Sequence, residues 1–367
     1  MEKLEAAMRQ QAFSENFIES SRDRRSFIQK VALGAAGLAY GSLRSFRKAA
    51  AAAVDPGKTD VSFVIGSDRR ENVYQTLLPF KDQIEEGIRD KKVIIKTNLV
   101  DPQTHLAATH PDAVRGVLDF LAPIYKERVI VGDSTGRPGG TYQCLVNHNY
   151  LPLKDEYKVE LVDLNYNDVG TMWIMDQNFH PLSIAIIDKF LDPDYYIISL
   201  TRPKTHNGAF VTLSVKNIVM GSPINVLTKK TRFLRGQKTL MHSGGNKGLN
   251  FNMFLLAQKV RPQFSVIDGL VGMEGNGASW GTPVYHGFAL AGPDMLAVDR
   301  VTTELMGVNF EDVGYLLYLA WAGEGQADLD KINIIGPDFR PYIIPYKMHD
   351  NIETHYVWKE GLIIGRE

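Results

Sequence analysis

Seven short runs of apolar, mostly β-branched residues recur along the chain. They cover residues 61–65, 93–96, 128–131, 159–162, 196–200, 264–267 and 332–335. Most of these runs are continuously apolar and do not alternate with polar residues. This pattern is typical of strands that are buried on both faces of a mainly parallel sheet. We therefore predict that these runs form the central sheet of the protein.

Helical periodicity fills several of the intervals between these runs. Residues 112–125 carry an apolar stripe at positions 114, 117, 118, 121 and 122, and Pro111 precedes it as expected for a first helical turn. Residues 295–306 and 312–322 show similar stripes. Alternating strands and helices predict an α/β fold with a mainly parallel, doubly wound sheet. In such sheets, ligands bind at the carboxyl ends of the strands.

The predicted α/β domain covers residues 54–337, and residues 338–367 form a C-terminal extension. This region contains no internal repeat and no low-complexity linker. A smaller subdomain inserted at residues 202–261 is an alternative to one continuous domain.

The first 53 residues have the layout of a bacterial signal peptide. Arg24 and Arg25 precede a soft apolar stretch at residues 31–43, and a run of alanines follows at residues 49–53. A basic region, a short apolar region and small residues for cleavage are the parts of a signal peptide. The paired arginines favour the twin-arginine export machinery, and thus a periplasmic or otherwise exported protein. The alternative is a short amphipathic helix with a chance arginine pair.

Composition excludes several classes of function. No apolar run reaches the roughly 20 residues of a membrane-spanning helix, so we expect no transmembrane helix in the mature chain. The formal net charge of −1 argues against a general nucleic-acid binder. Cys144 is the single cysteine of the sequence. One cysteine excludes an intrachain disulfide, a Cys-ligated zinc ion and a Cys-ligated iron–sulfur cluster.

Charge is strongly segregated along the sequence. Residues 195–267 contain no Asp or Glu, yet they carry eleven positive charges. These are Arg202, Lys204, Lys216, Lys229, Lys230, Arg232, Arg235, Lys238, Lys247, Lys259 and Arg261. Such a field concentrates anions, and glycine-rich turns at residues 243–248 offer backbone N–H groups to an oxyanion. One alternative is a solvated basic face that pairs with the acidic remainder of the chain, and another is a surface that docks an acidic protein or anionic lipid.

Polar side chains follow the ends of several predicted strands. Lys204 and His206 come directly after a buried strand, and together they supply a fixed positive charge and a titratable group. Lys216 is bordered by apolar residues, so burial would require a carboxylate or an anionic ligand as its partner. Arg232 and Arg235 could hold the same anion. His242 could join His206, either at the ligand or in a metal site assembled from distant positions.

Two further segments carry acidic residues. Asp268 and Glu274 lie in a glycine-dense segment at residues 268–277, and Asp133 and Ser134 follow another strand. The three carboxylates could bind a divalent cation or transfer protons, whereas the alternative is a glycine-rich turn with helix caps. Ser134 lacks the G-x-S-x-G pattern of a nucleophilic serine. We therefore treat Ser134 as a candidate ligand contact.

Several of these motifs together resemble one known family. They are residues 93–99, 108–111, 131–134, 203–206, 216–217, 267–277 and 291–299. In this order they resemble the bacterial and archaeal family called domain of unknown function 362. Many of its members carry ferredoxin-like cysteine motifs, which this sequence lacks. The resemblance implies that certain residues cluster: Lys96, Asn98, Asp133, Lys204, His206, Lys216, Asn217, Asp268 and Glu274.

The sequence thus predicts an exported α/β protein with a polar crevice that binds a small anionic ligand, either a carboxylate or a phosphate. The candidate catalytic residues are His206, Asp268 and Glu274. The ligand-binding candidates are Lys96, Asn98, Asp133, Ser134, Lys204, Lys216, Asn217, Arg232, Arg235 and His242, and a divalent cation would be held by Asp133, Asp268 and Glu274. Catalysis, ligand binding without chemistry, and docking of an acidic partner remain the three alternatives.

Overall fold

The computed structural model describes residues 57–136, 140–225 and 236–360, which belong to one compact unit. The predicted signal peptide at residues 1–53 lies outside the described residues, as do Arg232 and Arg235. In the described part of the chain, no helix is both long enough and apolar enough to cross a membrane.

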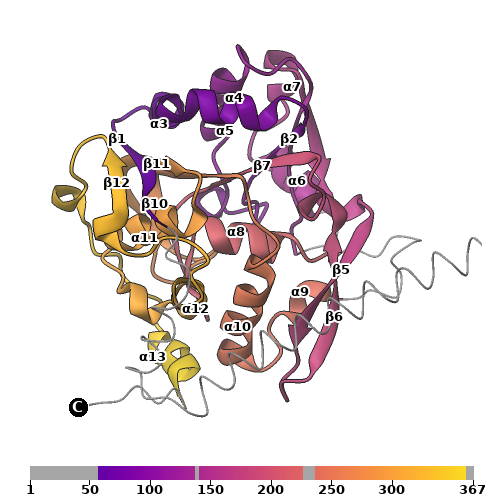
Figure 1. Cartoon of the computed structure of the whole chain (residues 1–367), viewed down its shortest axis with the longest axis vertical. Helices are drawn as coiled ribbons and strands as arrows, with labels where there is room; N and C mark the ends of the chain where they lie inside the picture. Colours follow the sequence, from indigo (N-terminus) through magenta and orange to yellow (C-terminus); the bar gives the residue numbers. More distant parts are fainter. Residues whose placement is uncertain (1–56, 137–139, 226–235, 361–367) are drawn as a thin grey trace, which may run out of the picture. The chain divides into compact units, whose positions relative to one another are not determined.

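A large mixed sheet runs through the centre of this unit (Figure 1). Its main path has the order β12-β1-β11-β10-β7-β2-β3-β4. The bounds are β12 Ile332–Ile335, β1 Thr59–Ile65, β11 Thr282–Gly292, β10 Phe264–Glu274, β7 Tyr195–Thr201, β2 Lys92–Lys96, β3 Val129–Asp133 and β4 Val159–Asp163. Neighbouring strands pair in parallel except around β11, which is antiparallel to both β1 and β10. All seven predicted strands are therefore confirmed, as is the mainly parallel α/β fold.

Two small strands and one hairpin accompany this path. The strand β8 (Lys204–His206) pairs with β10 and with β9 (Phe210–Thr212). The strands β5 (Val169–Met175) and β6 (Pro181–Ile187) form a separate antiparallel hairpin. The elements of residues 202–261 pack within the same compact unit as the rest of the described chain.

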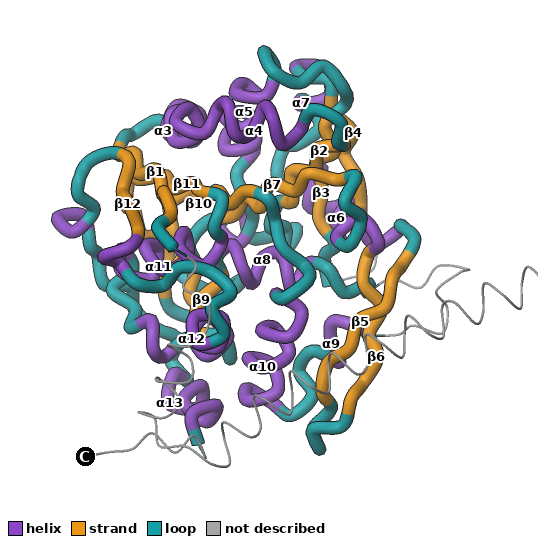
Figure 2. Tube along the Cα trace, in the orientation of Figure 1, coloured by secondary structure: helices purple, strands orange, loops and turns teal. Residues whose placement is uncertain are grey.

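Helices cover both faces of the sheet (Figures 1 and 2). One face carries α3 (Arg69–Leu77), α4 (Lys81–Ile88) and α5 (Pro111–Leu121), and the other carries α8 (Ser214–Gly221), α10 (Gly245–Ala257), α11 (Met295–Leu305) and α12 (Gly314–Trp321). The remaining α-helices are short: α6 Gly140–Asn147, α7 Leu153–Glu156, α9 Gln237–Leu240 and α13 Ile352–His355. The predicted helices at 112–125, 295–306 and 312–322 correspond to α5, α11 and α12.

Local sequence signals explain where α5 begins. His110 precedes α5, and its Nδ1 accepts a hydrogen bond from the Asp112 N–H at 3.1 Å, while Pro111 occupies the first helical position. The apolar stripe of α5, including Val114 and Val117, is fully buried against the sheet. Burial of this stripe orders the helix and the strand ends next to it.

The structure differs from the sequence-based expectation at β10. The sequence predicts a strand at residues 264–267 and then a glycine-dense segment, with a glycine-rich turn as one alternative. Residues 268–274 instead continue the strand to Glu274, with a register shift between Gly269 and Val271. Pairing with β11 supplies hydrogen bonds that a glycine-rich segment would otherwise find in a turn. This extension separates Asp268 from Glu274, six residues apart along one strand.

Candidate functional site

The candidate site lies where the carboxyl ends of β2, β3 and β7 meet, beside the first half of β10. Lys96, the last residue of β2, pairs with Gly132 on β3 and with Ser199 on β7. Ile267 on β10 lies level with Thr201 at the end of β7. The parallel register therefore places the residues that follow these strands at one edge of the sheet, where an α/β fold places its ligands.

A buried ion pair lies at the centre of this edge. Lys96 Nζ is 2.6 Å from Asp133 Oδ1, and both side chains are almost fully buried, at 1% and 6% exposure. Asp133 also accepts hydrogen bonds from the backbone N–H groups of Leu99 and Ser134. Burial lowers the pKa of Lys96 below its usual value, and the charge of Asp133 opposes part of that effect.

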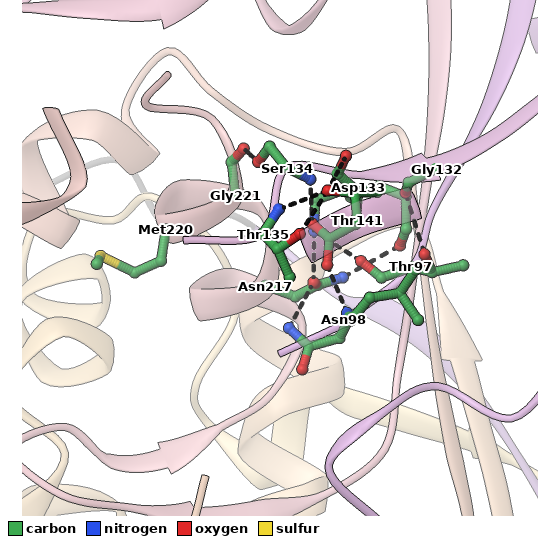
Figure 3. Close-up of polar contacts among 12 residues, drawn as sticks. Thr97, Asn98, Gly132, Asp133, Ser134, Thr135, Thr141, Asn217, Met220 and Gly221 are labelled. Carbon is green, nitrogen blue, oxygen red and sulfur yellow. Dashed lines mark hydrogen bonds and ion pairs between the residues drawn. The ribbon is translucent and has the colours of Figure 1, made fainter. Parts of the chain in front are cut away.

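Asn217 joins the ion pair to the next strand end. Its Oδ1 accepts hydrogen bonds from Lys96 Nζ (2.9 Å) and from Asn98 Nδ2 (3.0 Å). Its Nδ2 donates to the backbone oxygen of Lys96 (3.2 Å) and to Ser199 Oγ (3.0 Å). Figure 3 shows Asn98, Asp133 and Asn217 converging from three segments that are distant in sequence. All polar atoms of the Asn217 side chain are therefore satisfied, which fixes its position.

Lys204 extends the network beyond Asn98. Its Nζ donates to Asn98 Oδ1 (2.5 Å) and to the backbone oxygen of Ala107 (2.6 Å), and its side chain is fully buried. Both acceptors are neutral, and no carboxylate of the described residues forms an ion pair with it. Burial lowers the pKa of Lys204 well below its usual value, and the charges of Arg202 and Lys216 lower it further.

Lys216 is the least satisfied cation of the cluster. It lies in the first turn of α8 and is 7% exposed, yet its Nζ donates one long hydrogen bond, to Thr212 Oγ1 at 3.3 Å. Burial, together with the charge of Lys96, lowers the pKa of Lys216 to about 7. Its ammonium group therefore lacks the compensation that Asp133 gives to Lys96.

His206 and Ser134 border the same cluster. The Nδ1 atom of His206 is buried without a hydrogen-bond partner, and burial followed by the charge of Lys216 lowers the pKa of His206 well below its usual value. Ser134 Oγ donates to the backbone oxygen of Gly221 and accepts from Lys238 Nζ at 3.1 Å. Ser134 is therefore a contact of the cluster, and its hydroxyl is held between the Gly221 carbonyl and the Lys238 amine.

Two further cations of this edge were not among the site residues predicted from the sequence. Lys238 comes from α9, and its Nζ also donates to the backbone oxygen of Met220 at 2.6 Å. Arg202 is 3% exposed and donates to the backbone oxygen of Leu106 at 3.2 Å, while its Nε has no partner. Both residues lie in the acid-free residues 195–267, and this charge pattern was the signal for them in the sequence. The pattern did not distinguish cations that are buried from cations that are exposed.

The predicted carboxylates do not gather into one group. Asp268 is buried and bonded to Arg69 Nε at 2.8 Å, whereas Glu274 accepts a hydrogen bond from the Lys347 N–H at 2.7 Å. Six residues of extended strand separate them by roughly 20 Å. Within the described ranges, no group of three or more His, Cys, Asp or Glu residues could hold a metal ion. The extension of β10 thus separates Asp268 from Glu274, which were predicted to act together in catalysis with His206 and in metal binding with Asp133.

The remaining predicted residues have clear positions. His242 follows α9 and is exposed, although burial and the charge of Lys216 lower its pKa below the usual value. An open surface cavity of about 680 Å³ lies at the opposite edge of the sheet, lined by residues of both charges such as Lys92 and Glu127. It shares no residue with the cation cluster, so it is a separate feature of the surface.

Comparison with known proteins identifies the family of this chain. A family model described as Domain of unknown function (DUF362) matches residues 93–304, more than half of the chain. The chain belongs to this family. The resemblance derived from the sequence motifs is thereby confirmed. Lys96, Asp133, Lys204, Lys216 and Lys238 of the cluster lie within the matched DUF362 region, whereas Arg69 precedes it.

Two individual proteins are similar to this DUF362 chain. It is 27% identical over 224 residues to the thylakoid-associated protein sll1697 of Synechocystis sp. (strain ATCC 27184 / PCC 6803 / Kazusa). The match covers 59% of this chain and 64% of that protein, so the chain spans less than two thirds of its relative. A crystal structure of a Thermotoga maritima protein matches 71% of this chain and 60% of its own, with 11% identity and a TM-score of 0.38.

Proposed function

We propose that this protein binds a small anionic ligand, a carboxylate or a phosphate, at the carboxyl edge of its sheet. One observation carries the proposal. The site is built around four buried cationic side chains, those of Lys96, Arg202, Lys204 and Lys216, each at most 7% exposed. Of these four, Lys96 has an ion-pair partner among the described carboxylates, namely Asp133.

The charge balance of the cluster supports an anionic partner. Its cations are Arg69, Lys96, Arg202, Lys204, Lys216 and Lys238, and the nearby carboxylates are Asp133, Asp163 and Asp268. A buried charge without a partner costs several kcal/mol in effective desolvation energy. An anion that binds between Lys204 and Lys216 would recover much of that energy. The buried charges would thus lower the stability of the free protein and raise its affinity for the anion.

Burial also separates this proposal from docking of an acidic macromolecule. A docking surface needs exposed basic side chains, whereas Lys96 and Lys204 are 1% and 0% exposed. An acidic protein surface could not reach side chains buried to this extent. Catalysis remains a finer form of the same proposal, and His206 is its strongest candidate because its Nδ1 is unpartnered beside Lys216.

The proposal is tested by measuring thermal stability and calorimetric binding with phosphate, sulfate, lactate, succinate and citrate. We expect at least one anion to stabilise the protein, by about 2.7 kcal/mol at 100 times its Kd. Lys216→Ala should weaken binding at least about tenfold, because a bound anion favours the charged form of Lys216 and the variant removes that charge-assisted contact. The exposed Lys259 of the same acid-free segment provides the control Lys259→Ala, which should bind normally. Absence of binding for every anion would contradict the proposal.

We also propose that the protein is exported by the twin-arginine route. The proposal rests on the order of Arg24, Arg25, the apolar stretch and the alanine run in the sequence.

A further inference from the structure

The lysines of the cluster differ in how many hydrogen bonds their amines make. Lys96 Nζ contacts Asp133, Asn217 and the backbone oxygen of Thr97. Lys204 Nζ has two acceptors at 2.5 and 2.6 Å. Lys216 Nζ has one, at 3.3 Å, although its side chain is more than nine-tenths buried. Among the described residues, Lys216 is therefore the lysine of the site whose amine makes the fewest hydrogen bonds.

The surroundings of Lys216 favour an uncharged amine. Lys96 and Lys204 lie near it, and no described carboxylate is ion-paired to it. Lys216 is also the third residue of α8 (Ser214–Gly221), where the backbone N–H groups carry partial positive charge. Desolvation next to other cations is the environment that makes a lysine nucleophilic at neutral pH. The lowered pKa of Lys216, about 7, agrees with this geometry.

The same cations limit the ligand that such an amine could attack. An amine reacts with a carbonyl carbon, while the neighbouring charges of Lys204 and Lys96 attract a carboxylate. One small molecule that satisfies both is an oxo acid. We propose that Lys216 forms a Schiff base with the carbonyl carbon of a small oxo acid whose carboxylate is held by the buried cations beside it. This inference rests on the proposed anion site and names its substrate class.

The chemistry balances without a further reagent. The Lys216 nitrogen adds its lone pair to the carbonyl carbon, and a proton passes from nitrogen to oxygen to give a carbinolamine. Loss of that oxygen as water leaves a carbon–nitrogen double bond. We assign His206 to carry the proton between these atoms, because its buried Nδ1 has no hydrogen-bond partner among the described residues and Lys216 is the charge that lowers its pKa most.

Reductive trapping tests the inference. The full-length protein is incubated with pyruvate, 2-oxobutyrate or 2-oxoglutarate, reduced with sodium borohydride, and analysed by intact mass and peptide mapping. We expect one reduced oxo-acid unit per chain, with Lys216 labelled at least about tenfold more than any other lysine. Lys216→Arg should lose the adduct, whereas Lys259→Arg should keep it. The wild-type peptide map decides the matter even if Lys216→Arg folds poorly.

Binding of lactate, measured in parallel by calorimetry, separates this inference from the proposed anion site. Lactate has the carboxylate of pyruvate but no carbonyl group. If lactate and pyruvate bind and no adduct forms at Lys216, the Schiff base is overturned while the anion site stands. An adduct spread evenly over exposed lysines also overturns it. If none of these acids binds and none is trapped, both the inference and a carboxylate site fail.

Discussion

Two buried lysines of the same site show how much a partner matters. Lys96 is compensated by Asp133 at 2.6 Å and by Asn217 at 2.9 Å. Lys216 is buried almost as deeply, but Thr212 Oγ1 at 3.3 Å is its one hydrogen-bond partner in the described chain. The first arrangement stabilises a charged amine, and the second favours a neutral one. The two residues therefore differ in chemistry although they share one cluster.

The pH dependence of stability should reveal this difference in Lys216→Met. Burial lowers the pKa of Lys216 from 10.5 to about 7. Between these values the unfolded chain binds more protons at this residue than the folded chain. Its contribution therefore makes the wild-type protein more stable as the pH rises, and below pH 7 the full burial penalty remains. The variant lacks this term, so its stability relative to wild type should fall by about 1.4 kcal/mol per pH unit above 7.

Urea unfolding at several pH values between 6.5 and 9.5 measures this slope. The charged neighbours of Lys216, namely Lys96, Lys204, His206, Lys238 and His242, are common to both proteins and largely cancel in the difference. Lys259→Met serves as the control, because its side chain is exposed. A difference between Lys216→Met and wild type that stays constant with pH would show that Lys216 is charged throughout.

At this scale the sequence predicted which residues meet but not how they bond. Strand ends in parallel register brought Lys96, Asn98, Asp133 and Lys204 together, as the order of the motifs implied. That Asn217 bonds both Lys96 and Asn98 depends on side-chain direction within α8, which no pattern in the chain encodes. The sequence groups Glu274 with Asp268 because both lie in one glycine-dense segment, and no pattern shows that this segment continues the strand.

At the scale of elements, α8 is held in place at both ends. Asp299 of α11 accepts hydrogen bonds from the N–H groups of Ser214 and Val215, at 2.8 and 2.9 Å. Burial raises the pKa of Asp299 to about 8. At the other end, a Cβ at Gly221 would lie 2.4 Å from Lys96 Cε and 2.7 Å from its Nζ. A glycine is therefore required where α8 approaches β2.

Gly221→Ala tests whether this close approach supports the ion pair. The added methyl group should displace the Lys96 amine from Asp133. Breaking a buried pair costs about 3–5 kcal/mol when one charge is left alone, so we expect a loss of roughly 2–4 kcal/mol. Urea unfolding measures it. Gly136→Ala is the matched control, because its Cβ would meet an ordinary contact at 4.0 Å. Equal stability of the two variants would contradict the role assigned to Gly221.

One physical reason explains why the sequence did not predict certain strands. β11 and the β5–β6 hairpin pair antiparallel, and their burial alternates or varies along the strand. Continuous apolar runs identify strands buried on both faces, so they found β2, β3 and β7 but could not identify these. The sequence predicted the apolar first part of β10, at residues 264–267. It did not predict the glycine-containing part that continues the strand to Glu274.

At the scale of the whole molecule, charge segregation in sequence becomes segregation in space. The acid-free residues 195–267 form β7 to α10, and four of their cations reach the carboxyl edge of the sheet. Acidic residues elsewhere bring the formal net charge to −1. The positive potential is therefore focused on one site, which is the arrangement expected for capture of a small anion.

This site exists only in the folded chain, because its residues come from β2, β3, α8 and α9. If a ligand binds before export, the protein must cross the membrane folded, as the twin-arginine route allows.

We expect Arg24→Lys combined with Arg25→Lys to leave the full-length chain in the cytoplasm of a bacterial host. The wild-type protein should reach the periplasm shortened near Ala53. Cell fractionation measures the location of the protein, and intact mass measures the length of the chain. As a control, Arg44→Lys combined with Arg47→Lys keeps the paired arginines and should be exported normally. Export of the Arg24 and Arg25 variant at the wild-type level would exclude this route.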